Sequence, residues 1–164
     1  QSLAAAADLA QAAGCQVRML GDALEGEARD VATAMAETAR TAQKALKSGD
    51  KPLVLLSGGE LTVTRRGDGI GGPNAEFCLA LALALDGAPG IHALACDTDG
   101  VDGAAEVAGA LIGPKTLAGQ RAAAETALAR NNAHGFFARV NAQVVTGPTL
   151  TNVNDFRAVL VFPA

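Results

Sequence analysis

The sequence predicts an α/β domain of three layers, α/β/α, in which helices cover both faces of a mixed β-sheet. Apolar segments of strand length alternate along the chain with segments of helix length, and this alternation is typical of α/β folds. Glycine- and aspartate-rich turns separate the segments. The 164 residues are the size of one domain with a proper core. Because aromatic residues make up only 3%, we expect Ala, Leu and Val to fill that core.

The first 50 residues predict a helix, a strand and a second helix. Residues 2–13 are rich in alanine, Ser2 is a suitable N-cap, and Gly14 follows as a stop. Residues 15–20 alternate as a strand does, and residues 25–47 predict a long helix.

The middle of the chain predicts three strands and one buried helix. Residues 52–56 are a short apolar run, and residues 61–64 alternate between apolar side chains and threonine. Pro73 stands at a first helical position, and the helix that it opens is almost wholly apolar through residue 85. Residues 91–96 are apolar on both faces apart from one histidine. We therefore expect a central strand with helices on each side.

The last third of the chain predicts further strands and helices of a mainly parallel or mixed sheet. The expected elements are a strand at 107–112, a helix at 114–130, a helical turn at 136–140, and strands at 143–145 and 158–162.

Charge, cysteines and hydropathy exclude several classes of protein. A net charge of −4 argues against a partner that is a nucleic acid or an anionic membrane. The three cysteines lie far apart without metal-site spacing, which indicates free thiols and a cytoplasmic location. No apolar run reaches the ~18 residues that span a bilayer. The sequence starts with glutamine inside a predicted helix, so we expect it to be a piece of a longer polypeptide.

Four polar or glycine-rich loops follow predicted strands. They are residues 57–60, 65–74, 97–103 and 146–155. In an open α/β sheet the loops at the carboxyl ends of the strands line the ligand crevice, so we expect these four to converge on one site.

The loop at 65–74 formally contains G-x-G-x-x-G in Gly67, Gly69 and Gly72. A dinucleotide fingerprint also needs an acidic residue about 20 positions further on, which is absent at that spacing. An anion cradle fits better, because glycines expose amides, the next helix offers its positive end, and Arg65 or Arg66 supplies charge. A mobile surface turn is the alternative.

The loop at 97–103 brings three carboxylates together. Asp97, Asp99 and Asp102 lie within six residues, which suits Mg²⁺ or the hydroxyl groups of a polar substrate. An Asx-turn with solvated carboxylates is the alternative. Ser57 does not stand in a G-x-S-x-G motif, so a serine hydrolase is disfavoured.

The order of these motifs resembles the MOFRL domain, the C-terminal half of the glycerate 2-kinase family, whose members are often called hydroxypyruvate reductases. The matching segments are LSGGELTV, the glycine-rich loop with its N-x-E-F, DTDGVDG and TGPTLTNVND. The resemblance implies the C-terminal domain of a two-domain enzyme that uses ATP and Mg²⁺ to phosphorylate the 2-hydroxyl of D-glycerate. Its active site would lie in a cleft against a Rossmann-like N-terminal domain. Residues 51–164 would form the MOFRL-like domain, and residues 1–50 a connecting segment.

The resemblance also implies roles for residues. Asp99, Asp102 and Arg66 are expected to be catalytic, and Asp97 with Asp99 to hold the metal. Pro73 replaces an arginine that many relatives carry, and Arg66 or Arg65 is the proposed substitute. The other matched positions are expected to bind substrate or phosphate: Ser57, Gly58, Gly59, Glu60, Gly71, Gly72, Asn74, Glu76, Thr149, Asn152 and Asp155.

Two other functions remain open from the sequence. The older family name and the glycine motif allow an NAD(P)-dependent hydroxypyruvate reductase. A non-catalytic domain that closes over a ligand or mediates assembly would also explain loops that need a partner. As a part of such a kinase, the isolated chain is expected to fold but to be inactive.

Overall fold

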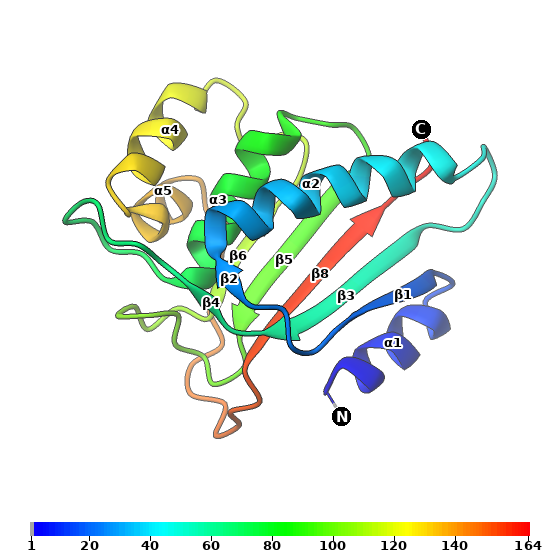
Figure 1. Ribbon diagram of the computed structural model, residues 1–164, viewed down its shortest axis with the longest axis horizontal. Coiled ribbons are helices and arrows are strands. Elements are labelled where there is room, and N and C mark those ends of the chain that lie inside the picture. Colours follow the sequence, from blue (N-terminus) through cyan, green and yellow to red (C-terminus); the bar gives the residue numbers. More distant parts are fainter. Residues whose placement is uncertain (1) are drawn as a thin grey trace.

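The computed structural model describes residues 2–164 and contains a six-stranded sheet with most of its helices on one face (Figure 1). The helices are α1 (Ser2–Ala12), α2 (Ala28–Ala45), α3 (Pro73–Leu85), α4 (Arg121–Ala129) and α5 (Ala133–Arg139). The strands are β1 (Gln16–Gly21), β2 (Gly26–Glu27), β3 (Leu53–Gly59), β4 (Leu61–Thr62), β5 (Ile91–Asp97), β6 (Gly109–Ile112), β7 (Gln143–Val144) and β8 (Asp155–Val161).

The large sheet is mixed, as predicted. Its strand order is β1-β3-β8-β5-β6-β7, and only β1 and β3 pair in parallel among the described strands. Of the two alternatives, a mainly parallel or a mixed sheet, the mixed one is present, because β8 returns to the middle and runs against both neighbours. This arrangement places the carboxyl ends of β3 and β5 beside the first residue of β8, at one edge of the sheet.

The two faces of the sheet are covered unequally. Helices α2 to α5 form a layer on one face, where they enclose the main apolar core with Leu55, Ile91 and Val159. On the other face only α1 is present within residues 2–164, and it packs over β1 and β3 through Leu3. The three layers are thus confirmed, but the expectation that helices cover both faces of β5 is wrong.

Helix α3 is the central element of the helical layer. It contacts α2, α4 and α5 as well as strands β5 and β6, so Phe77, Leu79 and Leu81 are fully buried. Its nearly uniform apolar sequence follows from this position, since a helix surrounded by protein needs no polar stripe. The predicted start at Pro73 is confirmed. No helix in the described part of the chain is long and apolar enough to cross a membrane.

Several boundaries differ from the sequence-based expectations. Strand β3 continues through Ser57–Gly59 and β8 begins at Asp155, so parts of two motifs expected in loops lie in strands. The helix expected from residue 114 starts only at Arg121, because successive turns and Gly119 at φ +69° precede it. Strand β2 was not predicted, and it pairs with β4 in a separate two-stranded sheet.

The first 50 residues are part of this layered unit. Strand β1 is an edge strand of the large sheet, and α2 packs along α3. The segment expected to connect to the domain therefore contributes one of its strands and one of its helices.

Candidate active site

Four loops meet at the edge where β3 and β5 end and β8 begins. Gly58 at the end of β3 accepts a 2.8 Å hydrogen bond through its carbonyl from Arg157 Nη2 on β8. The amide of Thr149 donates to the carbonyl of Asp99 at 3.1 Å, which joins the loops of residues 97–103 and 146–155. The glycine-rich loop reaches the same place, since a side chain at Gly103 would meet the Gly71 carbonyl at 2.8 Å. The convergence expected from the sequence is present.

Asp102 lies beneath the first turn of α3 and caps it. Its side chain is completely buried. Oδ1 accepts hydrogen bonds from the backbone amide and side-chain Nδ2 of Asn74, at 3.0 and 3.2 Å. Oδ2 accepts from the Ala75 amide at 2.8 Å and lies 2.9 Å from His134 Nε2. A negative group at this position also stabilises the positive end of the helix dipole, so the geometry gives Asp102 a positioning role.

The Asn74 side chain connects Asp102 to a second buried acid. Asn74 Nδ2 donates to Asp155 Oδ1 at 2.7 Å, and Asp155 Oδ2 lies 3.2 Å from Arg157 Nη1. Burial raises the pKa of Asp155, although the hydrogen bond from Asn74 and the charge of Arg157 oppose the change. Burial also lowers the pKa of Arg157, against the raising effect of Asp155. We call Asn74, Asp102, Asp155 and Arg157 the polar brace.

Asp97 and Asp99 lie outside the brace and are half-exposed. Asp97 stands opposite Asp155 in the β5–β8 register, and its Oδ1 accepts from the Asp99 amide at 3.0 Å. Asp99 Oδ1 accepts from the Val101 amide at 2.8 Å, as in an Asx-turn. Partial burial, followed by repulsion from Asp99 and Asp155, raises the pKa of Asp97. We call Asp97 and Asp99 the acidic rim.

The loop of residues 146–154 stands beside the acidic rim. Its short polar side chains are exposed, including Thr149 and Asn152. Thr98 holds this loop in place, because its Oγ1 donates to the Asn154 carbonyl at 2.9 Å and accepts from the Val153 amide at 3.0 Å. Thr149 Oγ1 in turn donates to the Thr98 carbonyl. The rim and its threonine- and asparagine-rich neighbour thus form one continuous polar surface.

The acidic rim suits a magnesium ion only with help from other ligands. Within residues 2–164 no three His, Cys, Asp or Glu side chains come close enough to hold a metal ion by themselves. Mg²⁺ is usually bound by one or two carboxylates together with waters and substrate phosphates. Asp97 and Asp99 supply that number of carboxylates, so the residues present fit the ion in this mode.

The amides of the glycine-rich loop are largely used within the protein. Arg66 and Gly67 donate to Asn131 Oδ1 at 2.6 and 2.9 Å, and Gly69 donates to the Arg130 carbonyl at 3.0 Å. The α3 amides of Asn74 and Ala75 are bound to Asp102, as described above. The loop therefore packs against the turn between α4 and α5, and these five amides do not form the phosphate cradle expected from the sequence.

A hollow of about 280 Å³ remains beside this loop. Arg65, Gly71, Gly72, Pro73 and Gly103 are among the residues that line it. The arginine at its mouth is exposed, as is Arg66. An anionic group would find a guanidinium here, but at position 73 the hollow is bounded by a proline ring.

The other matched positions divide into buried and exposed residues. Glu76 is fully buried and pairs with Arg29 Nε at 2.6 Å and with Asn131 Nδ2 at 3.0 Å. Ser57 is buried too, whereas Glu60 is exposed. Only exposed positions can reach a ligand without a change of structure, which favours Glu60, Thr149 and Asn152 over Ser57 and Glu76.

Sequence reasoning missed the partners that complete this buried network. They are Arg29, Asn131, His134 and Arg157. One signal was available for Arg157. Successive side chains of a strand point to opposite faces, so Arg157 lies on the same face of β8 as Val159, which is apolar and points inward. Asn131 has φ +53°, a conformation that asparagine adopts more easily than most residues. No such pattern marks Arg29 or His134.

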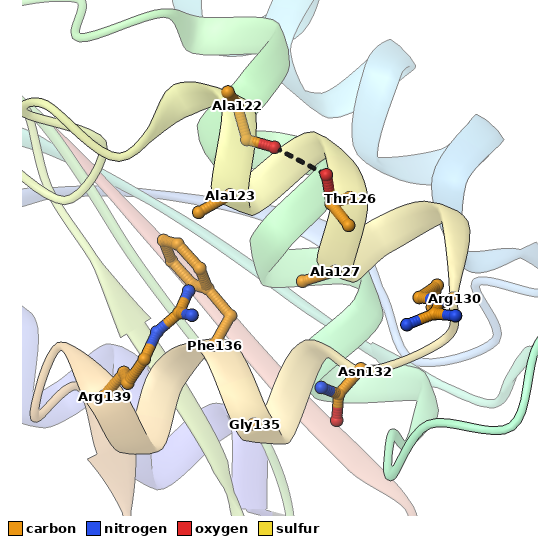
Figure 2. Close-up of a pocket in the computed structure, with 9 residues that line it drawn as sticks. All are labelled: Ala122, Ala123, Thr126, Ala127, Arg130, Asn132, Gly135, Phe136 and Arg139. Atoms are coloured by element: carbon orange, nitrogen blue, oxygen red, sulfur yellow. Dashed lines mark hydrogen bonds between the residues drawn. The ribbon is translucent and has the colours of Figure 1, made fainter.

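A second hollow, of about 400 Å³, lies between α4 and α5 (Figure 2). Arg130 and Arg139 lie at its two ends, and the Arg139 guanidinium is 5.8 Å from the centre of the Phe136 ring. Alanines of α4 line it between them. Of the residues predicted to be functional, none lines this hollow.

Comparison with known proteins assigns the chain to a family. The model of the MOFRL family matches residues 53–155. A protein of Agrobacterium vitis that carries a provisional hydroxypyruvate reductase name is 50% identical over 98% of this chain and 43% of its own length. The D-glycerate 2-kinase of Thermotoga maritima is 33% identical over 92% of this chain and 37% of its own length.

A solved structure agrees with these matches. The crystal structure of glycerate kinase from T. maritima superimposes with a TM-score of 0.90 at 32% identity, covering 96% of this chain and 39% of that one. The chain thus spans about two fifths of the length of these relatives. The matched segment includes all four converging loops, and the chain belongs to the MOFRL family.

Proposed function

We propose that this chain is the MOFRL domain of an ATP-dependent glycerate 2-kinase, and that its loop edge forms one wall of the active-site cleft. The observation that carries the proposal is the position of a half-exposed acidic rim beside a buried, hydrogen-bonded polar brace. Phosphoryl transfer depends on positioning and charge stabilisation rather than on covalent chemistry by the protein. A rim held from below supplies positioning, and its carboxylates supply metal ligands.

Each part of the edge has a proposed role. Asp97 and Asp99 would hold Mg²⁺, which supplies charge neutralisation for the transferring phosphoryl group. Asn152 would donate a hydrogen bond to a small hydroxy acid such as D-glycerate, and Thr149, whose hydroxyl donates to the Thr98 carbonyl, would accept one from a hydroxyl group of that acid. Arg65 or Arg66 would face an anionic group of the nucleotide or the acid. Asp102 and Asp155 would act from within the brace, as positioning residues.

About three fifths of each of these relatives lies outside the part that this chain covers, which leaves room for a second wall of the active-site cleft. We propose that it belongs to another domain of the same polypeptide, in a cytoplasmic enzyme, since the kinases named above are longer than this chain. The 164-residue chain alone would then bind ligands weakly and turn none over.

An NAD(P)-dependent hydroxypyruvate reductase is the second candidate, favoured by the name of the A. vitis relative. In a dinucleotide fold the glycine-rich loop presents its amides to a pyrophosphate. Here the amides of Gly67 and Gly69 are bonded to Asn131 and Arg130 instead. This use of the donors supports the kinase over the reductase.

The test is an activity assay of the longer polypeptide, which contains this domain and the region that the relatives have outside the matched portion. D-glycerate with ATP and Mg²⁺ should give phosphoglycerate, whereas hydroxypyruvate with NADH should give no oxidation of the nicotinamide. Turnover of NADH without phosphoryl transfer would overturn the proposal. If neither reaction occurs while the protein is folded, the proposal also fails, and the non-catalytic alternative takes its place.

A further inference from the structure

One face of the large sheet is apolar and only partly covered. Helix α1 packs over β1 and β3, where Leu3 contacts Val54 and Leu56. Figure 1 shows α1 beside β1, while α2 to α5 lie on the opposite side of the sheet. Within residues 2–164 no helix covers this face of β5 and β6.

The uncovered area is formed by side chains in adjacent positions of three strands. Leu111 of β6 stands opposite Leu94 of β5, and Cys96 of β5 stands opposite Phe156 of β8. Leu160 extends the same face along β8, opposite His92. We call Leu94, Cys96, Leu111, Phe156 and Leu160 the open sheet face.

The open sheet face is packed only along its β8 side. Phe156 and Leu160 are partly buried against the α1 cluster. Leu94 and Leu111 belong to neither of the two hydrophobic clusters of the described chain, and Leu111 is 49% exposed. Apart from His92, no titratable nitrogen or carboxylate lies on this face of β5 and β8 between residues 91 and 96 and between 156 and 162. At its margin a hollow of about 280 Å³ is bounded by His92 and by residues 113–116.

The sequence of β5 is typical of a strand that is buried on both faces. A strand with one face in water alternates apolar and polar side chains, whereas a strand buried on both faces is a nearly continuous apolar run. In β5, Leu94 and Cys96 occupy the face that the described helices leave open. Contiguous apolar patches of this kind usually mark an interaction surface.

We propose that the open sheet face docks the region that the relatives possess outside the matched portion, through an apolar segment of that region. The length of the relatives carries the choice of occupant, because about three fifths of the T. maritima kinase lies outside the part that this chain covers. This inference rests on the proposed function only in assuming a longer polypeptide. It adds that the two regions meet over a sheet face as well as at the catalytic edge.

Cysteine labelling tests the proposal without any need for activity. In a Cys15→Ser/Cys96→Ser background of the longer polypeptide, Leu111→Cys is compared with Leu9→Cys, whose parent side chain on α1 is 74% exposed. Cys78 is kept because it is fully buried. The rate of reaction with a maleimide should be at least ~10-fold lower at position 111 than at position 9, relative to the unfolded protein.

The outcomes separate the possible occupants. Equal rates at the two positions would show that the face is open to water and would overturn the proposal. Protection at position 111 that disappears on dilution, or a disulfide between two copies through Cys at 111, would show that a second copy covers the face and would overturn it as well. Protection that is independent of concentration supports it, and this result stands even if the kinase assay is negative.

Discussion

The polar brace and the acidic rim contain the same kinds of residue in opposite environments. Asp102 in the brace is completely buried and accepts from two α3 amides, the Asn74 side chain and His134. Asp99 in the rim is half-exposed, and its side chain accepts a hydrogen bond from the nearby Val101 amide. The two aspartates are three residues apart. The difference shows that one short motif contains both a carboxylate that holds the scaffold and a carboxylate that is accessible to solvent.

Loss of the Asp102 carboxylate should have the largest effect on stability. Asp102→Ala leaves the amides of Asn74 and Ala75 and the ring of His134 without a partner in a buried site. Removal of one partner from a buried charged network costs about 3–5 kcal/mol, so we expect the free energy of unfolding to fall by that amount. Urea denaturation followed by circular dichroism measures it.

The matched control is Asp99→Ala on the acidic rim. It should change the free energy of unfolding by less than about 0.5 kcal/mol, because surface substitutions away from buried contacts rarely do more. Similar losses for the two variants would break the distinction between brace and rim.

In catalysis the order of Asp102 and Asp99 should be reversed, because Asp99 is the residue that we expect to contact metal or substrate. Asp99→Asn keeps the size and the acceptor oxygen of the side chain but removes its charge, so it should fold normally. If Asp99 holds Mg²⁺ or substrate, kcat/KM of the longer polypeptide should fall by about 100-fold, which corresponds to about 2.7 kcal/mol. Steady-state kinetics at saturating Mg²⁺ would test this, and wild-type values would remove Asp99 from the site.

The sequence predicted which residues lie at the candidate site better than it predicted whether each of them is buried or exposed. The order of motifs identified all four converging loops, and the apolar pattern identified α3 and its start at Pro73. Asp99 and Asp102 looked equivalent, because the burial of Asp102 depends on His134, 32 residues away in the sequence. Asp155 was expected in a loop, since TNVND reads as turn residues, yet the structure places it at the start of β8.

The open sheet face shows a second limit. The apolar sequence of β5 predicted burial on two sides, but the described helices cover only one face of this strand, and the pattern does not indicate which segment would cover the other. Pairing across the sheet was similarly hidden, because β8 follows β7 in the sequence but lies between β3 and β5. Local patterns predict elements, whereas contacts between distant segments decide topology.

Pro73 precedes Asn74 of the polar brace, and its substitution is expected to have a smaller effect. Pro73→Arg should lower the free energy of unfolding by about 0.4–1 kcal/mol, because proline restricts the unfolded chain and suits the first helical position. The new guanidinium would extend the charge at the hollow beside Arg65 and should strengthen phosphate binding by a few fold. Amide chemical shifts during a phosphate titration measure this, with Pro73→Ala as the uncharged control. Equal affinities in the two variants would argue against an anion subsite there.

The smallest expected effect concerns the charge of Asp97. Partial burial, with Asp99 and Asp155 nearby, raises its pKa in the folded state, so the folded protein holds this proton more tightly than the unfolded chain does. Ionised Asp97 therefore costs stability above its raised pKa, and the cost disappears as the pH falls through that pKa toward about 3.8.

Asp97→Asn should consequently raise the free energy of unfolding at pH 7, by about 0.5 kcal/mol, since solvent screens a half-exposed group. The asparagine oxygen can still accept from the Asp99 amide, so the turn is kept. Urea midpoints of the two proteins should differ at pH 7 and converge near pH 4. A variant that is less stable than the wild type at pH 7 would mean that Asp97 is held by a favourable charge interaction, and that it belongs with the brace rather than with the rim.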